Sequence, residues 1–258
     1  MFEVRVKPRV GVIAVGGKGL RMQPLTRCTP KVMLQVGGKS LLTRQLELMR
    51  DMLGISRVFL VVDYLQNDIR RRYGTGSDIG LDICYVENHS CDGGLGTVLI
   101  AVEPHITGPF VLFLGDELYL NTNHDELLEL DRGGIAVCGI HPTNDLNTIR
   151  KNYAVEIENG FITKLIEKPT FAPTPFVGCG TFVLEPSIFA YSRETKPSVI
   201  SGKLELIDIL NHASSRGAPI IPFILSGQYC NVNTVDDLLA ADRLARLHGD
   251  VHELAEVL

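Results

Sequence analysis

The chain has 258 residues, enough for one large domain or two small domains with a buried core. Its 25 basic and 30 acidic residues give a formal net charge of −5, whereas a nucleic-acid surface needs clustered cations. The longest apolar runs, such as residues 110–114, are far too short to span a bilayer, and residues 1–10 lack the apolar segment of a secretory leader. We therefore expect a cytoplasmic protein that binds neither nucleic acid nor a membrane.

The first predicted element is a buried strand over residues 10–15, which are small or β-branched and apolar. It leads directly into the glycine-rich segment 16–19, where backbone N–H groups can approach an anion without meeting Cβ atoms. Arg21 and Lys31 bring two cations to the same region. Bare amides next to cations predict a site for phosphates.

Two common phosphate-binding patterns are incomplete here. The P-loop needs a glycine five residues before Gly-Lys-Ser, and residues 38–40 supply that ending, but Met33 occupies the glycine position. The dinucleotide-binding pattern G-x-G-x-x-G begins at Gly17 and Gly19 and fails at Met22. Neither a P-loop ATPase nor a nicotinamide-dependent enzyme is favoured.

Strands and helices alternate through the rest of the first half. Apolar runs predict strands at residues 58–62, 81–86 and 110–114, and apolar side chains spaced three or four apart between 42 and 53 predict a helix. This alternation is typical of a parallel sheet with helices on both faces. Ligands of such sheets bind beyond the carboxyl ends of the strands.

The segments 16–17, 93–97 and 115–116 each follow a predicted strand and each contain glycine. We therefore expect them to converge on one site. Asp116 is the metal candidate there, because Mg²⁺ prefers oxygen ligands, and Glu117 beside it is a candidate to accept a metal-bound water.

The second half of the chain is less regular. Strands are predicted at residues 135–140, 154–157, 161–166 and 181–184, with a hairpin turn at 158–160. Thr234 and Asp237 are spaced as in a capping box and predict the start of a final helix.

Residues 16–26 read GGKGLRMQPLT and are followed by Pro30 and Lys31. This segment resembles the signature of the sugar-phosphate nucleotidyltransferases, G-G-x-G-T-R-L-x-P-L-T followed by P-K, without a gap. Leu20 departs from it, because it replaces a threonine whose hydroxyl could touch the nucleotide phosphates.

The resemblance implies a Rossmann-like, three-layer α/β/α fold of the GT-A-like type, with a mixed, mostly parallel sheet. It implies a single domain over residues 1–258, with nucleotide binding in about 1–135 and acceptor binding in about 136–258. The implied reaction is attack by an acceptor phosphate on the α-phosphorus of a nucleoside triphosphate, with Mg²⁺ as cofactor and pyrophosphate as product (EC 2.7.7 class). The implied partners are the triphosphate and a phosphorylated small molecule such as a sugar 1-phosphate, and a homo-oligomer is left open.

The resemblance also assigns roles to residues at matching positions. The implied catalytic residues are Arg21, which stabilises the leaving pyrophosphate, Lys31, and Asp116, which holds the metal. The implied nucleotide-binding residues are Val15, Gly16, Gly17, Gly19, Leu20, Arg21, Gly96 and Thr97. The implied acceptor-binding residues are Lys31, Tyr153, Glu167, Lys168 and Gly180, and the implied metal ligands are Asp116 with Asn231 or Asn233.

Several positions depart from the family pattern. Asn231 and Asn233 stand in a segment where the family typically has an aspartate, so weaker metal binding is expected, since an amide oxygen contributes no charge. Ala154 and Gly178 replace a glycine and an asparagine of the acceptor pocket. Cys91 occupies the place of a glutamine common in uridylyl and thymidylyl enzymes, with Glu87 as the nearest upstream candidate, so the base is left open.

These departures keep three alternatives open. One is a cytidylyltransferase that acts on a cyclitol phosphate or a phosphoalkyl acceptor. Another is a non-catalytic regulatory subunit that binds a nucleotide-sugar, which Leu20, Asn231 and Asn233 would suit. A glycosyltransferase of similar fold is less favoured, because it would not need both Arg21 and Lys31.

Overall fold

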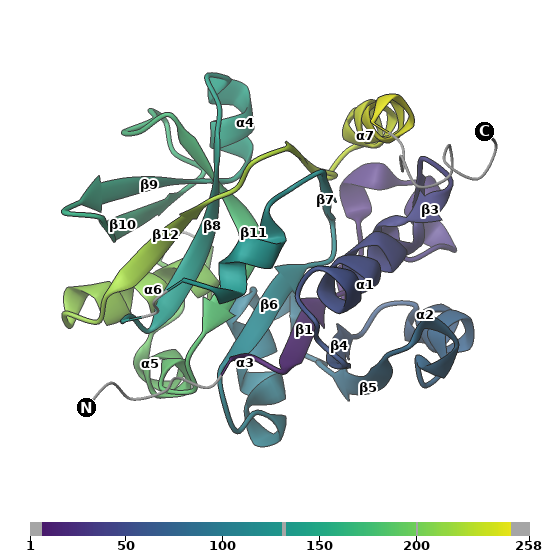
Figure 1. Cartoon of the computed structure of the whole chain (residues 1–258), viewed down its shortest axis with the longest axis horizontal. Coiled ribbons are helices and arrows are strands. Elements are labelled where there is room, and N and C mark those ends of the chain that lie inside the picture. The colour runs from purple at the N-terminus through teal and green to yellow at the C-terminus, as the bar shows by residue number, and fades with distance from the viewer. Residues whose placement is uncertain (1–6, 131–132, 200, 249–258) are drawn as a thin grey trace.

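The computed structural model describes residues 7–130, 133–199 and 201–248 (Figure 1). A nine-stranded mixed sheet forms its centre, in the order β10-β9-β11-β6-β1-β4-β5, with β8 paired to β11 and β12 paired to β8. The predicted fold class is confirmed. The strands are β1 (Val10–Ala14), β4 (Arg57–Val62), β5 (Asp82–Glu87), β6 (Phe110–Leu114), β8 (Ala136–Pro142), β9 (Tyr153–Glu158), β10 (Phe161–Glu167), β11 (Phe176–Leu184) and β12 (Ile220–Ile224).

The four strands of the first half are parallel to one another. In register, Val10 of β1 pairs with Arg57 of β4 on one side and with Phe110 of β6 on the other. These strands therefore end together at one edge of the sheet. Strand β11 instead runs antiparallel to β6, β8 and β9 and joins the two halves of the sheet.

Helices cover both faces of the sheet, as the alternating pattern predicted. Helices α3, α5 and α6 contribute to the core on one face, and α1 and α2 contribute to the core on the other (Figure 1). No helix in the described part of the chain is long and apolar enough to cross a bilayer. The helices are α1 (Leu41–Asp51), α2 (Gln66–Tyr73), α3 (Gly96–Val102), α4 (Leu146–Lys151), α5 (Ile188–Glu194), α6 (Leu206–Ser215) and α7 (Val235–Leu247).

Local sequence explains the ends of α1 and α7. The Ser40 hydroxyl accepts a hydrogen bond from the Thr43 N–H and begins α1, and the helix buries Leu42, Leu46 and Met49 on the sheet. The predicted capping box of Thr234 and Asp237 is present at the start of α7. Helix α7 packs against the small hairpin of β2 (Gln35–Val36) and β3 (Lys39–Ser40).

Five short strands were not predicted from the sequence: β2 and β3 of the small hairpin, and β7, β12 and β13. Strand β12 contains Pro222, which an edge strand tolerates because its N–H side needs no partner. Strands β7 (Glu117–Leu120) and β13 (Gln228–Asn231) pair with each other outside the main sheet. Their pairing brings residues 231–233 next to residues 116–117, and the Val232 N–H donates to the Asp116 carbonyl at 2.8 Å.

Candidate active site

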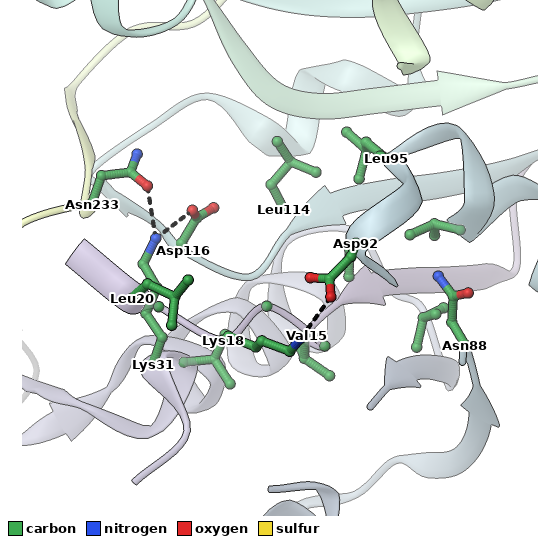
Figure 2. Close-up of a pocket in the computed structure, with 18 of the residues that line it drawn as sticks. Val15, Lys18, Leu20, Lys31, Asn88, Asp92, Leu95, Leu114, Asp116 and Asn233 are labelled. Atoms are coloured by element: carbon green, nitrogen blue, oxygen red, sulfur yellow. Dashed lines mark hydrogen bonds and ion pairs between the residues drawn. The ribbon is translucent and has the colours of Figure 1, made fainter. Parts of the chain in front are cut away.

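A cavity of about 590 Å³ opens beyond the carboxyl ends of β1, β5 and β6, where ligands of such sheets bind. Side chains from distant segments point into it, with Lys31, Asp116 and Asn233 gathered on one side (Figure 2). We call it the larger cavity. The structure places six of the predicted nucleotide-binding residues in its wall: Val15, Gly16, Gly17, Gly19, Leu20 and Arg21.

Gly19 turns the glycine-rich segment toward the cavity. Its φ of +60° lies in the left-handed region, which glycine adopts without strain. Its carbonyl accepts a hydrogen bond from the Thr26 hydroxyl at 2.8 Å, and a Cβ atom on Gly19 would lie only 3.0 Å from the Thr26 methyl group. The short 3₁₀ turn that follows, Leu20–Met22, carries Arg21 over the cavity.

Two cations and two oxygen ligands meet at one end of the larger cavity. Lys31 is only 8% exposed. Its ammonium group lies 2.7 Å from Asp116 Oδ2 and 2.8 Å from Asn233 Oδ1. The guanidinium of Arg21 donates to the same Asn233 oxygen at 2.6 Å. A nearly buried ammonium requires such partners, because an unpaired buried charge is strongly unfavourable.

Asp116 and Asn233 fit a magnesium site. Their oxygens already converge on one positive centre, the Lys31 ammonium. In the part of the chain that the structure describes, no group of three or more His, Cys, Asp or Glu side chains could hold a metal ion. A site with one carboxylate and one amide suits Mg²⁺, which takes its remaining ligands from water and substrate phosphates.

Asn231, the other predicted ligand, is directed elsewhere. Its side-chain oxygen accepts a hydrogen bond from the Asn233 amide, and its own amide donates to Asn152. The structure thus brings Asn233 to Arg21 and Lys31, but it does not bring Asn231 there.

Gly96 and Thr97 lie behind the cavity wall. The Gly96 N–H donates to the Leu204 carbonyl at 2.7 Å, and a Cβ atom on Gly96 would lie 2.6 Å from Leu204 Cγ. The Thr97 hydroxyl accepts a hydrogen bond from the Asn88 amide at 2.9 Å. It is Asn88, 6% exposed and directly after β5, that reaches the cavity. Its position at a strand end is the signal that could have identified it.

Glu87, one of the two candidate positions for recognition of the base, does not line the larger cavity. It pairs with Arg70 at 3.1 Å, and the side chain of Cys91, the other candidate, lies outside the described residues. Lys18 and Asp92, which were not predicted, form an ion pair of 2.6 Å between the glycine-rich segment and the loop after β5 (Figure 2).

A smaller cavity of about 140 Å³ adjoins the larger one, and Leu95, Leu114 and Glu205 line both. Four predicted acceptor-binding residues lie in its wall: Tyr153, Glu167, Lys168 and Gly180. The fifth, Lys31, lines only the larger cavity. Lys151, Asn152 and Asn231 also line the smaller cavity and were not predicted as acceptor ligands.

The hydroxyl of Tyr153 turns into the protein rather than toward the smaller cavity. It donates to the Cys179 carbonyl at 3.0 Å, and the residue is 7% exposed. The ring fills the space beside Gly178, where a Cβ atom would lie 1.9 Å from a ring carbon. The glycine that replaces the family's asparagine is therefore required by the packing of Tyr153.

Glu117 is buried beneath Gly180, at the boundary of the smaller cavity. It accepts hydrogen bonds from the Gly180 N–H at 2.6 Å, from the Tyr229 hydroxyl at 2.9 Å and from the Tyr119 hydroxyl. Burial, and then the neighbouring charge of Asp116, raise the pKa of Glu117 to about 8. These bonds direct the carboxyl away from the expected role as acceptor of a metal-bound water.

Comparison with known proteins gives a consistent result. The family described as nucleotidyl transferase matches residues 10–246. The UTP–glucose-1-phosphate uridylyltransferase AglF of Haloferax volcanii is 29% identical over 247 residues, covering 95% of this chain and 99% of AglF. The low-salt glycan biosynthesis nucleotidyltransferase Agl11 of the same organism is 28% identical over 235 residues, which are 91% of this chain but only 65% of Agl11.

Solved structures support the fold. A UDP-glucose pyrophosphorylase complexed with UDP-glucose aligns with a TM-score of 0.78 and 21% sequence identity, covering 92% of this chain and 97% of that chain. The similarity extends over both the parallel and the antiparallel halves of the sheet.

Proposed function

The chain belongs to the nucleotidyl transferase family, and from that membership we propose that it joins a nucleoside triphosphate to a sugar 1-phosphate or a similar phosphate. The products are a nucleotide-linked sugar and pyrophosphate, and Mg²⁺ is required. The observation that carries this proposal is the meeting of Arg21, Lys31, Asp116 and Asn233 in the larger cavity, next to a smaller one with two further lysines.

The proposed reaction is a direct displacement. An oxygen of the acceptor phosphate forms a bond to the α-phosphorus, and the bond from the α-phosphorus to the α–β bridging oxygen breaks. The electron pair of that bond leaves with pyrophosphate. No general base is needed, because the acceptor phosphate is already ionised near neutral pH. Positioning and charge neutralisation supply most of the catalysis of such transfers.

The cations have separate roles in this proposal. Arg21 stabilises the charge that develops on the leaving pyrophosphate, as a donor fixed in place before the reaction. Lys31, at the end of the larger cavity, and Lys168, in the wall of the smaller one, hold the two reacting phosphates against their mutual repulsion. Asp116 and Asn233 would hold Mg²⁺, which supplies further neutralisation of phosphate charge when bound.

We also propose the division into a nucleotide part, about residues 1–135, and an acceptor part, about 136–258, within one domain. The wall of the larger cavity supports it, since most of its residues precede residue 135. Three residues of the second half, Lys203, Glu205 and Asn233, cross this boundary and also line the larger cavity.

One experiment tests the proposal and identifies both substrates. The protein is incubated with Mg²⁺ and each of ATP, CTP, GTP, UTP and dTTP, together with glucose 1-phosphate, mannose 1-phosphate, inositol 1-phosphate or glycerol 3-phosphate. We expect pyrophosphate with a sugar 1-phosphate, and loss of that signal in Arg21→Ala. Pyrophosphate only with CTP and inositol 1-phosphate or glycerol 3-phosphate would instead establish the cytidylyltransferase alternative. Calorimetric binding of a triphosphate without any turnover would indicate a regulatory subunit.

A further inference from the structure

Three asparagine side chains form a continuous line between the two cavities. Asn233 lines the larger cavity, whereas Asn231 and Asn152 line the smaller one. The Asn233 amide donates to Asn231 Oδ1, and the Asn231 amide donates to Asn152 Oδ1. The Asn152 amide in turn donates to the Thr148 carbonyl at 2.9 Å. Residues from α4, β13 and the start of α7 thus share one hydrogen-bonded chain.

Both ends of this chain fix its direction. An asparagine offers an accepting oxygen on one side and a donating NH₂ group on the other. Lys31 and Arg21 only donate, so they must face the Asn233 oxygen, at 2.8 and 2.6 Å. The Thr148 carbonyl only accepts, so it must face the NH₂ group of Asn152. Turning any single amide over would place two donors or two acceptors against each other.

The same residues are tied to the predicted acceptor ligands through the backbone. The Asn152 carbonyl accepts a hydrogen bond at 2.7 Å from the N–H of Lys168, whose φ of +44° is rare for a residue with a side chain. The side chain of Lys151 pairs with Asp237 at 3.1 Å, and Asp237 also accepts from the Asn233 N–H at 3.1 Å. Hydrogen bonds and an ion pair thus connect the lysines of the smaller cavity to the residues of this hydrogen-bonded chain.

We propose that Asn152, Asn231 and Asn233 act as a positioning relay that couples the occupancy of the smaller cavity to the placement of Arg21 and Lys31. This inference rests on the proposed function, because it gives the smaller cavity to the acceptor and the larger one to the triphosphate. A bound acceptor fixes Asn152 and thereby orients the Asn233 oxygen toward the two cations. By reciprocity, a bound triphosphate strengthens acceptor binding by the same factor.

Calorimetry with a triphosphate analogue measures this coupling. The analogue has a methylene group in place of the α–β bridging oxygen and the base that the substrate panel identifies. Its Kd is determined with Mg²⁺, with and without saturating acceptor. We expect the acceptor to tighten binding by roughly 5- to 150-fold, the usual range of such couplings. In Asn152→Leu, which keeps the branched shape of the side chain but loses both hydrogen bonds, the ratio should fall toward one, the value at which coupling is lost.

Two further variants separate the relay from a general effect on folding. Asn152→Asp keeps the oxygen that accepts from Asn231 but sets its second oxygen against the Thr148 carbonyl, so its coupling should lie between those of Asn152→Leu and the unmodified protein. Asn147→Ala changes an exposed asparagine of α4, the helix that ends just before Asn152, and should retain all of the coupling. A ratio near one in the unmodified protein, or a ratio unchanged in Asn152→Leu, overturns the relay.

A measurement without substrates keeps the relay distinct from the proposed function. The side-chain amide signals of Asn231 and Asn233 are recorded by NMR in each variant. Asn233 does not bond to Asn152, so the relay predicts that the signals of both Asn231 and Asn233 shift in Asn152→Leu, but not in Asn147→Ala. Unchanged Asn233 signals overturn the relay even if the enzyme is active. A substrate panel without turnover overturns the proposed function and leaves this result standing.

Discussion

The two cavities of this protein are built in opposite ways. The larger one lies beyond the ends of parallel strands, and about half of its lining residues, including Gly16, Gly17 and Gly19 with Arg21 and Lys31, come from residues 14–32. The smaller one is lined by side chains of α4, β9, β10, β11 and α6, which come from well-separated parts of the chain. Phosphate binding can therefore be encoded in one short segment, whereas an acceptor pocket depends on how several strands pack.

Their charges are also arranged differently. In the larger cavity Lys31 pairs with the Asp116 carboxylate, and Arg21 and Lys31 both donate to the neutral amide oxygen of Asn233. In the smaller cavity each lysine has its own carboxylate: Lys168 lies 2.9 Å from Glu167, and Lys151 lies 3.1 Å from Asp237. Arg21 and Lys31 carry two positive charges against the single negative charge of Asp116, and this excess suits a polyanion. The paired charges of the smaller cavity suit hydroxyl groups together with a single phosphate.

Among the substitutions that alter the charge of the larger cavity, Arg21→Ala should have the largest effect on turnover. Loss of one fixed donor to a developing charge should lower turnover by roughly two to three orders of magnitude. The rate of pyrophosphate release at saturating substrates measures it. Arg27→Ala, which removes an exposed arginine of the next turn that does not line either cavity, serves as the control and should be near normal. Near-normal release by Arg21→Ala would remove Arg21 from the mechanism.

Asp116→Asn tests the carboxylate that pairs with Lys31 in the larger cavity. The Mg²⁺ concentration needed for half-maximal turnover should rise by roughly tenfold or more, since even the hydrogen-bonding partners of metal ligands contribute that much. The readout is the magnesium titration rather than the maximal rate, because the change also removes the charged partner of Lys31. Asp125→Asn, at an exposed position of the 3₁₀ turn His124–Leu128, should leave the titration unchanged. An unaltered titration for Asp116→Asn contradicts its role as a ligand.

The amino-acid sequence alone predicted most of the main-sheet strands in the first half of this protein. Strands β1, β4, β5 and β6 were predicted, because buried parallel strands are continuous apolar runs. The glycine-rich segment was identified as a phosphate site because few other kinds of site combine glycines with two cations at this spacing. The capping box at Thr234 was also found, since its two residues interact over only three positions.

What the sequence did not reveal depends on contacts between distant residues. Which of Asn231 and Asn233 lies against Lys31 follows from the pairing of β7 with β13, two four-residue strands without a distinctive pattern. The placement of Gly96 follows from its close approach to Leu204, more than a hundred residues away. The burial of Glu117 follows from Tyr119, Tyr229 and Gly180 meeting around it.

A pair of glycine substitutions sharpens the contrast between the two cavities. Gly178→Ala must displace the Tyr153 ring and should lower the free energy of unfolding by about 1–3 kcal/mol, the usual effect of overpacking. Gly17→Ala meets no atom within 4 Å, so the free energy of unfolding should change by less than about 0.5 kcal/mol. Its methyl group instead enters the larger cavity and should weaken triphosphate binding. Urea unfolding and calorimetry separate the two effects, and equal destabilisation by both substitutions would remove the contrast.

The last prediction is a gradual dependence of the free energy of unfolding on pH, which arises from Glu117 at the boundary of the smaller cavity. The pKa of Glu117 is raised to about 8 in the folded protein, mainly by burial, from an ordinary value of 4.5. Between these values the folded protein holds one proton more than the unfolded chain, so the stabilisation is complete below pH 4.5 and decreases as the pH rises toward 8. The free energy of unfolding should fall by at most about 1.4 kcal/mol per pH unit from this group.

Glu117→Gln removes the titrating group but keeps an oxygen that can accept from the Gly180 N–H. Urea unfolding at pH 5.5, 6.5 and 7.5 should therefore give a flatter profile for Glu117→Gln than for the unmodified protein. Glu158→Gln, in the exposed hairpin between β9 and β10, should retain the original slope. Parallel profiles for Glu117→Gln and the unmodified protein would mean that Glu117 is already ionised when folded. In that case the charge of the smaller cavity would not be neutralised in pairs, and the difference from the larger cavity would be one of shape alone.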